Sequence, residues 1–257
     1  MMTTTAEKSE ILRSLHVPGT PLIVTNVWDA VTARIVAGAE GVKALATASH
    51  AVSFAHGVPD GEGLTVEQAL ETARLVVSAV DLPVSIDFER GYATTLPELE
   101  SNIARLVDVG AAGLNIEDSL PDKTLRPVDA ATARIASVRS AGGNIVINAR
   151  ADSLARGESF EQMVERANSY LGAGADCVFV LGLSNEDLVK RALDAIDGKI
   201  SVFSGPSSVP LKRLAELGVS RVSFGPGTLG LTLAHLQKAA AQLTALGVYP
   251  AELGFTY

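Results

Sequence analysis

The chain has 257 residues, 47% of them hydrophobic, and a formal net charge of −8. This length permits one barrel-sized domain with one large core, and the negative charge, without any Lys/Arg run, argues against nucleic acid as a partner. The one cysteine, Cys177, lies in an apolar run, where we expect an inert thiol, and it excludes an intramolecular disulfide and a thiolate metal cage.

The N-terminus, residues 1–10, is polar and lacks the apolar segment of a secretory signal. No stretch of the chain approaches about 18 consecutive apolar residues, so the sequence predicts no transmembrane helix. We therefore expect a cytoplasmic protein that has no membrane partner.

Short β-branched runs recur along the chain, each followed by an amphipathic stretch. The predicted strands are 21–26, 43–47, 83–89, 112–117, 144–150, 176–181, 199–204 and 221–225. Their starts lie about 22 to 40 residues apart, which is typical of β/α units. Eight such units favour an α/β fold of the closed (β/α)8 TIM-barrel type, with residues 1–257 as a single domain.

Helix boundaries are also marked in the sequence. Thr65 with Gln68, and Ser159 with Gln162, have the spacing of capping boxes, in which each residue satisfies the other's free backbone donor. Three glycines follow apolar-periodic runs where a left-handed residue is expected to end a helix: Gly110, Gly172 and Gly218.

One helical segment, around residues 231–246, follows the eighth predicted strand. Its repeated Leu and Ala positions could cover its own barrel or pack on a partner subunit. The sequence leaves both arrangements open.

Inward-facing polar groups are predicted at three neighbouring strand ends. Val84, Ile86 and Phe88 suit the helix-facing side of their strand, so the alternate residues face the barrel interior. The same reasoning applied to three strands gives Asp87 and Glu89, then Asn115 and Glu117, then Asn148 and Arg150. Catalytic groups of such barrels lie at the C-terminal strand ends, so we expect these side chains to meet.

Three acids opposed by one arginine predict a bound cation. Crowded carboxylates are costly without compensation, and a set of oxygen ligands points to Mg²⁺ or Mn²⁺ on Asp87, Glu89 and Glu117. Arg150 would then bind a carboxylate or phosphonate of the substrate in bidentate geometry. In the alternative reading, Arg150 only neutralises the acids as part of a buried ion-pair network.

The long connection 48–64 contains Ser49, His50, His56 and Asp60. Its backbone donors could hold a carboxylate while Asp60 reaches the water shell of the metal. The composition of residues 59–61 is also that of a plain turn, and both histidines would equally suit packing or surface positions.

Two further segments have a functional and a structural interpretation. The loops 204–208 and 225–227 follow strands seven and eight, where many barrels bind phosphate, but their serines and glycines also suit turns. Trp28 and Asp29 follow the first strand and would line the pocket, although Asp29 is equally placed to cap a helix.

These segments together resemble the isocitrate lyase/phosphoenolpyruvate mutase superfamily. The matching stretches, in family order, are Asn26-Val27-Trp28-Asp29-Ala30, Gly57-Val58-Pro59-Asp60-Gly61, Asp87-Phe88-Glu89-Arg90-Gly91-Tyr92, Asn115-Ile116-Glu117-Asp118, Asn148-Ala149-Arg150-Ala151-Asp152 and Gly172-Ala173-Gly174-Ala175-Asp176. The resemblance runs in the family's order from residue 26 to about residue 225, which is most of the chain. Each motif alone is weak, but the ordered set is specific.

The resemblance implies an oligomeric barrel, a dimer or tetramer, whose last helix is exchanged between subunits. It implies Mg²⁺ and cleavage or rearrangement of a C–C or C–P bond beside a 2-oxo or 2-hydroxy acid, through a pyruvate-like enolate. Transferred by position, Asp87, Glu89 and Glu117 would surround the metal, with Asp60 nearby. Arg150 would bind substrate, and the backbone of Ala48, Ser49 and His50 would hold its carboxylate. Arg150, Asp60 and Glu117 are therefore the expected catalytic groups, with Trp28, Asp29, Asn115 and Asn148 around the substrate.

The chain departs from the family pattern after strand four. Lyases of the family carry a Cys- and His-containing loop there, whereas residues 119–127 contain neither and form a short loop. This argues against isocitrate or methylisocitrate cleavage, and an open site favours decarboxylation, retro-aldol cleavage or hydrolysis over a mutase reaction. Ala48 stands where several members have Ser, and the C-terminal tail is shorter than usual.

Two other functions remain open at this stage. The missing proton donor would suit a barrel that binds a 2-oxo-dicarboxylate such as 2-oxoglutarate without transforming it. Phosphate in the loops after strands seven and eight would instead indicate a phosphate-binding isomerase, and a phosphonopyruvate hydrolase or phosphonomutase is a weaker option.

Overall fold

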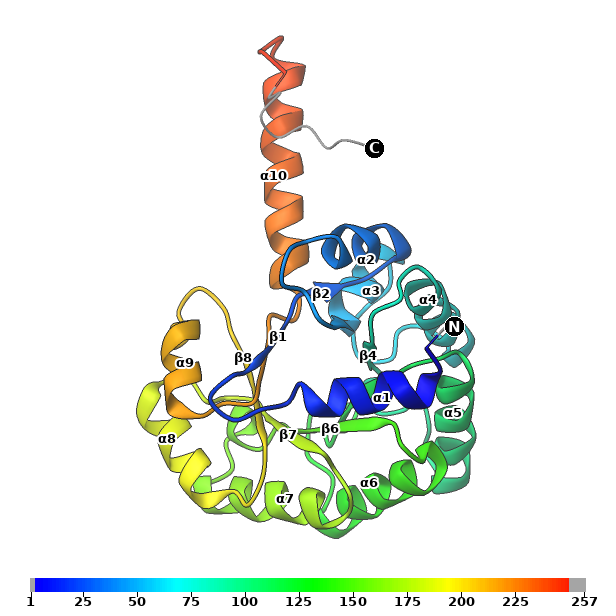
Figure 1. The fold of residues 1–257 in the computed structure, drawn as a ribbon, viewed down its shortest axis with the longest axis vertical. Helices are drawn as coiled ribbons and strands as arrows, with labels where there is room; N and C mark the ends of the chain where they lie inside the picture. Colours follow the sequence, from blue (N-terminus) through cyan, green and yellow to red (C-terminus); the bar gives the residue numbers. More distant parts are fainter. Residues whose placement is uncertain (1–2, 250–257) are drawn as a thin grey trace.

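The computed structural model describes residues 3–249, and all eight predicted strands form within them. The first is divided into β1 (Leu22–Val24) and β2 (Asn26–Val27). β1 pairs with β9 (Arg221–Ser223), whereas β2 pairs with β3 (Leu45–Thr47). Because the two halves of one strand reach both ends of the parallel sheet, the sheet closes, and the (β/α)8 barrel is confirmed (Figure 1).

The remaining elements alternate as β/α units around this barrel. The other strands are β4 (Val84–Asp87), β5 (Gly113–Glu117), β6 (Val146–Ala151), β7 (Cys177–Val180) and β8 (Ile200–Phe203). The outer helices are α2 (Ala30–Ala37), α4 (Val66–Ser78), α5 (Leu96–Asp108), α6 (Val128–Gly142), α7 (Phe160–Gly172), α8 (Glu186–Ala195) and α9 (Leu211–Leu217). A short helix, α3 (Ser49–Ala55), forms where the sequence predicted only a loop, and a 3-10 turn, η1 (Leu154–Arg156), follows β6.

The predicted alternation along the strands is confirmed. Val84, Ile86 and Phe88 are buried in the hydrophobic layer between the sheet and the helices. Asp87 pairs in register with Asn115, and Glu117 with Arg150, so the members of each pair share the inner face. The strand pattern therefore directs these polar groups into the barrel.

Most predicted helix ends agree with the structure. Thr65 and Ser159 both form complete capping boxes, and Gly218 ends α9 in the left-handed region at φ 107°. Gly110 also has a positive φ, of 93°. The prediction for Gly172 was wrong: it is the last residue of α7, and Gly174, at φ 107°, reverses the chain instead.

An N-terminal helix, α1 (Thr5–Ser14), was not predicted. It lies across one end of the barrel (Figure 1), and Leu12 is fully buried there. Leu12 packs with the inward side chains of six strand or strand-flanking residues: Leu22, Val24, Ala44, Ala46, Ala112 and Val146. Gly113 accommodates it, since a Cβ there would lie 2.7 Å from Leu12 Cδ2. The amino-terminal end of the barrel is therefore closed by an apolar plug.

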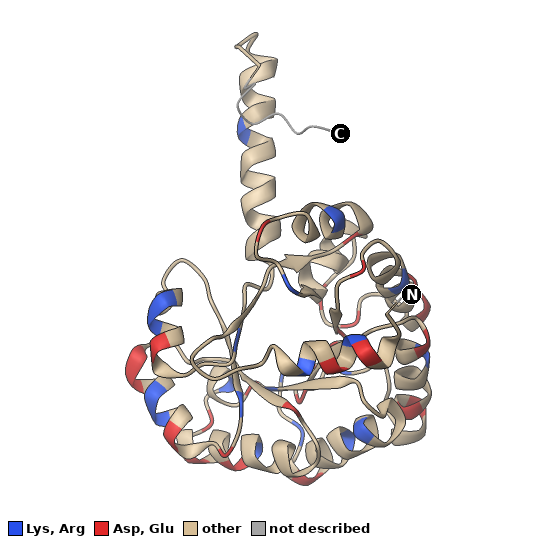
Figure 2. Ribbon diagram, in the orientation of Figure 1, with Lys and Arg blue, Asp and Glu red and all other residues tan. Residues whose placement is uncertain are grey.

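The last helix, α10 (Gly227–Thr244), leaves the barrel and projects away from it (Figure 1). Leu229 is buried, but Leu231 is 76% exposed and Leu236 63% exposed. Lys238 is the one charged residue of the helix (Figure 2). The sequence left open whether this segment packs on its own barrel. Residues 230–244 do not pack on it, so that alternative is wrong for them. No helix among residues 3–249 is long and apolar enough to cross a bilayer.

We expect Leu12→Ala to lower the free energy of unfolding by about 3 kcal/mol, because it leaves a cavity in the apolar plug. Ile11 is the matched control, because it lies on the same helix with 44% of its surface exposed; its replacement by Ala should change stability by less than about 0.5 kcal/mol. Urea unfolding followed by circular dichroism measures both. Equal effects of the two changes would contradict the plug.

Candidate active site

A cavity of about 260 Å³ opens where the C-terminal ends of the strands meet. Its lining comes from eight strands or the loops that follow them: Asn26, Thr47, Ala48, Ser49, His50, Asp60, Asp87, Asn115, Arg150, Phe179, Leu181, Phe203, Ser223, Gly225 and Pro226. This is the end of a (β/α)8 barrel at which active sites are built.

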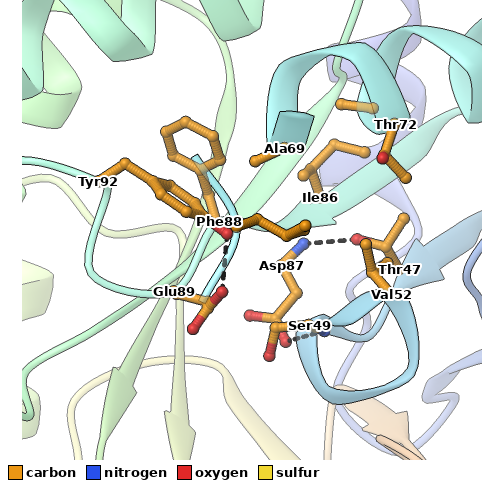
Figure 3. Close-up of a pocket in the computed structure, with 12 residues that line it drawn as sticks. Thr47, Ser49, Val52, Ala69, Thr72, Ile86, Asp87, Phe88, Glu89 and Tyr92 are labelled. Atoms are coloured by element: carbon orange, nitrogen blue, oxygen red, sulfur yellow. Dashed lines mark hydrogen bonds between the residues drawn. The ribbon is translucent and has the colours of Figure 1, made fainter. Parts of the chain in front are cut away.

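Asp87, the last residue of β4, is held rigidly at one side of the cavity. Its backbone N–H donates to Thr47 Oγ1 at 2.8 Å, and its carboxylate accepts from the Ser49 N–H at 2.9 Å (Figure 3). The Ser49 amide, expected to hold a substrate carboxylate, is thus used by Asp87 in this structure.

Glu89 lies just beyond β4 in a left-handed turn with φ 48°, an uncommon conformation for a glutamate. Its carboxylate accepts from the Tyr92 hydroxyl at 2.7 Å and from the Glu62 N–H at 2.5 Å. Figure 3 shows the carboxylates of Asp87 and Glu89 side by side. Burial raises the pKa of Glu89 to about 7, and the negative charges of Asp87 and Asp60 add to the increase against the Tyr92 hydrogen bond.

The predicted turn at residues 59–61 is confirmed, and hydrogen bonds hold it over the end of β4. Glu62 accepts from the Tyr92 N–H at 2.7 Å and from Arg90 Nε at 3.2 Å, while Arg90 Nη2 donates to the Gly61 carbonyl at 2.8 Å. Asp60 therefore stands at the rim of the cavity, 3.5 Å from Nδ1 of His50.

Arg150 enters the cavity from β6 between two acids. It forms an ion pair with Glu117, and its Nε and Nη2 donate to the two carboxylate oxygens of Asp152 at 2.7 and 2.9 Å. Burial lowers the pKa of Arg150, but the charges of Glu117 and Asp152 outweigh burial and raise it above its usual value. No residue within 3–249 accepts a hydrogen bond from Nη1, which leaves that group for a ligand.

Glu117 is more extensively paired than the other two acids. Besides Arg150, the Ser119 hydroxyl donates to it at 2.6 Å, and Arg90 Nη1 lies 3.6 Å away. Burial still raises the pKa of Glu117, opposed by the charge of Arg150. The alternative reading, neutralisation by arginine, therefore describes Glu117, whereas Asp87 and Glu89 form no ion pair with any Lys or Arg in the described part of the chain.

The carboxylates of the site suit Mg²⁺ better than they suit a metal whose ligands are all protein side chains. Across residues 3–249, no group of three or more Asp, Glu, His or Cys side chains is arranged to hold one ion. Mg²⁺ requires less, because it usually retains several waters and is held by one or two carboxylates together with the substrate. The adjacent carboxylates of Asp87 and Glu89 meet that need.

The other predicted site residues occupy different positions. Asn115 lines the cavity, but Asn148 is fully buried beneath it and donates to Asn115 Oδ1 at 2.8 Å. Asp29 caps α2 by accepting from the Thr32 N–H at 2.7 Å. Asp29 and Trp28 line a separate groove, which also includes His56, and Ala48 lines the cavity as the N-cap residue of α3.

Several residues that hold the site together were not singled out from the sequence. Asp152 shares the inward parity of Arg150 two residues earlier, so strand alternation could have identified it. Ser119, Glu62 and Arg90 act across turns, for which no such periodicity exists. Burial raises the pKa of Cys177 to about 12, in agreement with the expected inert thiol.

The loop after β5 forms a short closed hairpin. Ser119 and Leu125 form an antiparallel bridge, Leu120 N–H donates to the Thr124 carbonyl at 2.7 Å, and Arg126 N–H donates to the Asp118 carbonyl at 2.9 Å. The tip at residues 121–124 is exposed. A segment bonded to itself in this way is not a long lid over the cavity.

Comparison with known proteins identifies relatives over nearly the whole chain. Residues 12–244 match the family model of phosphoenolpyruvate phosphomutase. The protein Rv1998c of Mycobacterium tuberculosis H37Rv, whose function is uncharacterised, is 33% identical over 88% of this chain and 87% of its own. Oxaloacetate decarboxylase 1 of Pseudomonas putida W619 is 29% identical, covering 83% of this chain and 76% of its own. A crystal structure from Burkholderia cenocepacia J2315, described as a candidate phosphonomutase, has a TM-score of 0.87 and 39% identity over 92% of this chain and all of its own.

The raised pKa of Glu89, about 7 against an ordinary 4.5, predicts a specific pH dependence of metal-free stability. Between pH 4.5 and about pH 7, Glu89 keeps its proton in the folded state but has lost it in the unfolded state. The stabilisation that this proton gives is therefore complete at pH values below 4.5. It decreases as the pH rises toward the folded-state pKa, by up to about 3 kcal/mol.

We therefore expect wild type to lose more stability than Glu89→Gln between about pH 5 and pH 8 in EDTA, measured by urea unfolding. Addition of Mg²⁺ at the higher pH should stabilise wild type more than the variant. Parallel pH profiles of the two proteins would rule out the assignment.

Proposed function

Because the chain belongs to the phosphoenolpyruvate mutase/isocitrate lyase superfamily, we propose that it is a Mg²⁺-dependent lyase that cleaves a bond beside a small 2-oxo or 2-hydroxy acid. The family acts on small carboxylic acids, and named relatives are lyases and mutases, so the chain is an enzyme of this carbon–carbon or carbon–phosphorus lyase class. The observation that carries the finer proposal is that Asp87, which forms no ion pair, lines the same cavity as Arg150 and lies close to Glu89, which also forms none.

The ion would be held by Asp87 and Glu89, with waters completing its shell. Glu117, predicted as the third ligand, is instead paired with Arg150. When bound, Mg²⁺ supplies a Lewis acid for the oxygen that becomes negative as the pyruvate-like enolate forms. Mn²⁺ would suit the same oxygen donors.

Arg150 would bind the 2-oxo acid through Nη1, because Nε and Nη2 are already engaged. The bidentate contact with Asp152 fixes the plane of the guanidinium before substrate arrives, so little ordering is required on binding. Asp60 and His50 at the rim are the titratable pair placed to exchange a proton between the reacting molecule and solvent.

The short hairpin after β5 supports cleavage rather than a mutase reaction. A mutase must keep a reactive fragment away from water, whereas this hairpin is closed on itself and leaves its tip exposed. Decarboxylation, retro-aldol cleavage and hydrolysis all tolerate an open site. Cleavage of a C–C bond is therefore the proposed reaction, with C–P cleavage as the second choice.

Turnover can be tested with oxaloacetate, phosphonopyruvate, 2-hydroxy diacids and 4-hydroxy-2-oxo acids, with pyruvate or another 2-oxo acid detected as product. We expect activity with Mg²⁺ and none with EDTA, and Asp87→Asn and Arg150→Lys should each lower kcat/KM by about 100-fold or more. Calorimetric binding of a 2-oxo acid without turnover of any compound would select the binding-protein alternative instead.

Assembly through α10 is part of the same proposal. Leu229, Leu233, Leu236, Ala240 and Leu243 form one stripe on the helix, exposed after Leu229. On the barrel, Ile23 is 38% exposed on the outer face of β1, and α2 exposes Val31 and Ile35 on one face. Exchange of α10 between two copies would cover both surfaces.

We expect the protein to sediment as a dimer or tetramer and Leu236→Glu to lower its oligomeric state. The matched control is Gln237→Glu, which adds the same charge to the next residue, off the apolar stripe, and should retain the assembly. A wild-type monomer in analytical ultracentrifugation would contradict exchange.

A further inference from the structure

The cavity has an apolar side formed by the ends of two strands. Phe179 pairs in register with Arg150 and with Ser201, so it shares the inner face of the barrel with them. Phe203, two residues after Ser201, ends β8 on the same face, and Leu181 follows β7. We name Phe179, Leu181 and Phe203, which all line the cavity, the apolar wall.

The position of Phe203 is built into the backbone around it. A Cβ at Gly205 would lie 3.1 Å from the Phe203 ring, and one at Gly225 would lie 3.2 Å from it. Gly225 also has φ 52°, which few other residues adopt readily. These glycines leave space for the ring, and the Gly205 N–H is engaged by Ser208 Oγ at 2.8 Å, so this region is shaped around a phenylalanine and not around a phosphate.

The ring is nevertheless open to the cavity, with 39% of Phe203 exposed. An exposed aromatic ring gains free energy when an apolar group covers it. Phe179, which lines the same cavity, is 7% exposed. The wall is thus an apolar contact surface without a covering group in the described chain.

The charged residues of the cavity also limit which substrates it can hold. Its ionisable lining residues are His50, Asp60, Asp87 and Arg150, and the arginine is already paired with two acids. Arg90 and Arg221 are also buried near this end or inside the barrel, but neither lines the cavity. A second anionic group on the substrate would therefore face a wall that offers it no cation.

From this arrangement we infer that the apolar wall selects substrates whose substituent remote from the 2-oxo acid is uncharged and apolar, such as an alkyl chain. The inference rests on the proposed function for where the 2-oxo acid binds. The acid group occupies the side of Asp87 and Arg150, and the alkyl chain covers Phe203. Dicarboxylates and phosphonates are disfavoured because their second charge is desolvated without a partner.

The test compares 2-oxopentanoate with 2-oxoglutarate, which share one carbon chain and differ only in a terminal methyl or carboxylate. Calorimetry in Mg²⁺ gives both affinities, each expressed relative to oxalate, which has no remote substituent. We expect wild type to favour 2-oxopentanoate by about tenfold or more. Phe203→Arg should reverse the preference, and the matched control Phe203→Leu, which stays apolar, should keep it.

Circular dichroism shows whether Phe203→Arg folds. If it does not, Leu181→Arg tests the same reversal of the preference between the two acids at a second position. Equal affinities in wild type, tighter binding of 2-oxoglutarate, or a preference that neither arginine variant changes would overturn the inference. Binding of oxalate with neither longer acid would also overturn it, because the cavity would then hold no remote substituent. Failure of oxalate itself to bind would instead refute the proposed function, since oxalate probes only the Asp87 and Arg150 side.

Discussion

Uncompensated negative charge at the end of β4 is the constraint on which the rest of the site depends. Asp87 and Glu89 are adjacent and largely withdrawn from solvent, yet the two arginines nearby are committed to Glu117, Asp152 and Glu62. Like charges in a poorly solvated site raise one another's pKa and favour any bound cation. The surrounding hydrogen bonds, from Ser49, Tyr92 and the turn before α4, keep the carboxylates in place instead of letting them separate.

The barrel divides its mouth into two chemically different halves. β4 and β6 contribute the charged side chains of Asp87 and Arg150, β5 contributes the amide of Asn115, and β7, β8 and the loop after β7 contribute phenylalanine and leucine. The register of the sheet alone places Phe179 beside Arg150, so the boundary between the halves lies between neighbouring strands. A ligand that spans this boundary must itself be polar at one end and apolar at the other, which explains how a small pocket can orient a small molecule.

The sequence predicted the parts that repeat with a fixed period. Alternation along strands was enough to direct Asp87, Glu117 and Arg150 inward, because a buried parallel sheet tolerates no other phase for Val84 and Ile86. Contacts across turns had no such rule: Glu62 reaches Glu89 through a loop conformation that cannot be derived from spacing. The sequence did not reveal the position of α1, because the burial of Leu12 depends on six residues from several strands. It did not reveal that of α10 either, because the stripe beyond Leu229 has no partner within residues 3–249.

The apolar plug formed by Leu12 and α1 closes the amino-terminal end of the barrel, so the cavity opens at the opposite end. Under the proposed function, substrate and products would all pass through the open end of the cavity, so two fragments could not leave by separate exits. In the proposed reaction, the fragment nearer the opening would leave first and the fragment bound by Arg150 would leave last. Such a sequence of departures would give the retained acid the character of a competitive inhibitor and the other fragment that of a noncompetitive one.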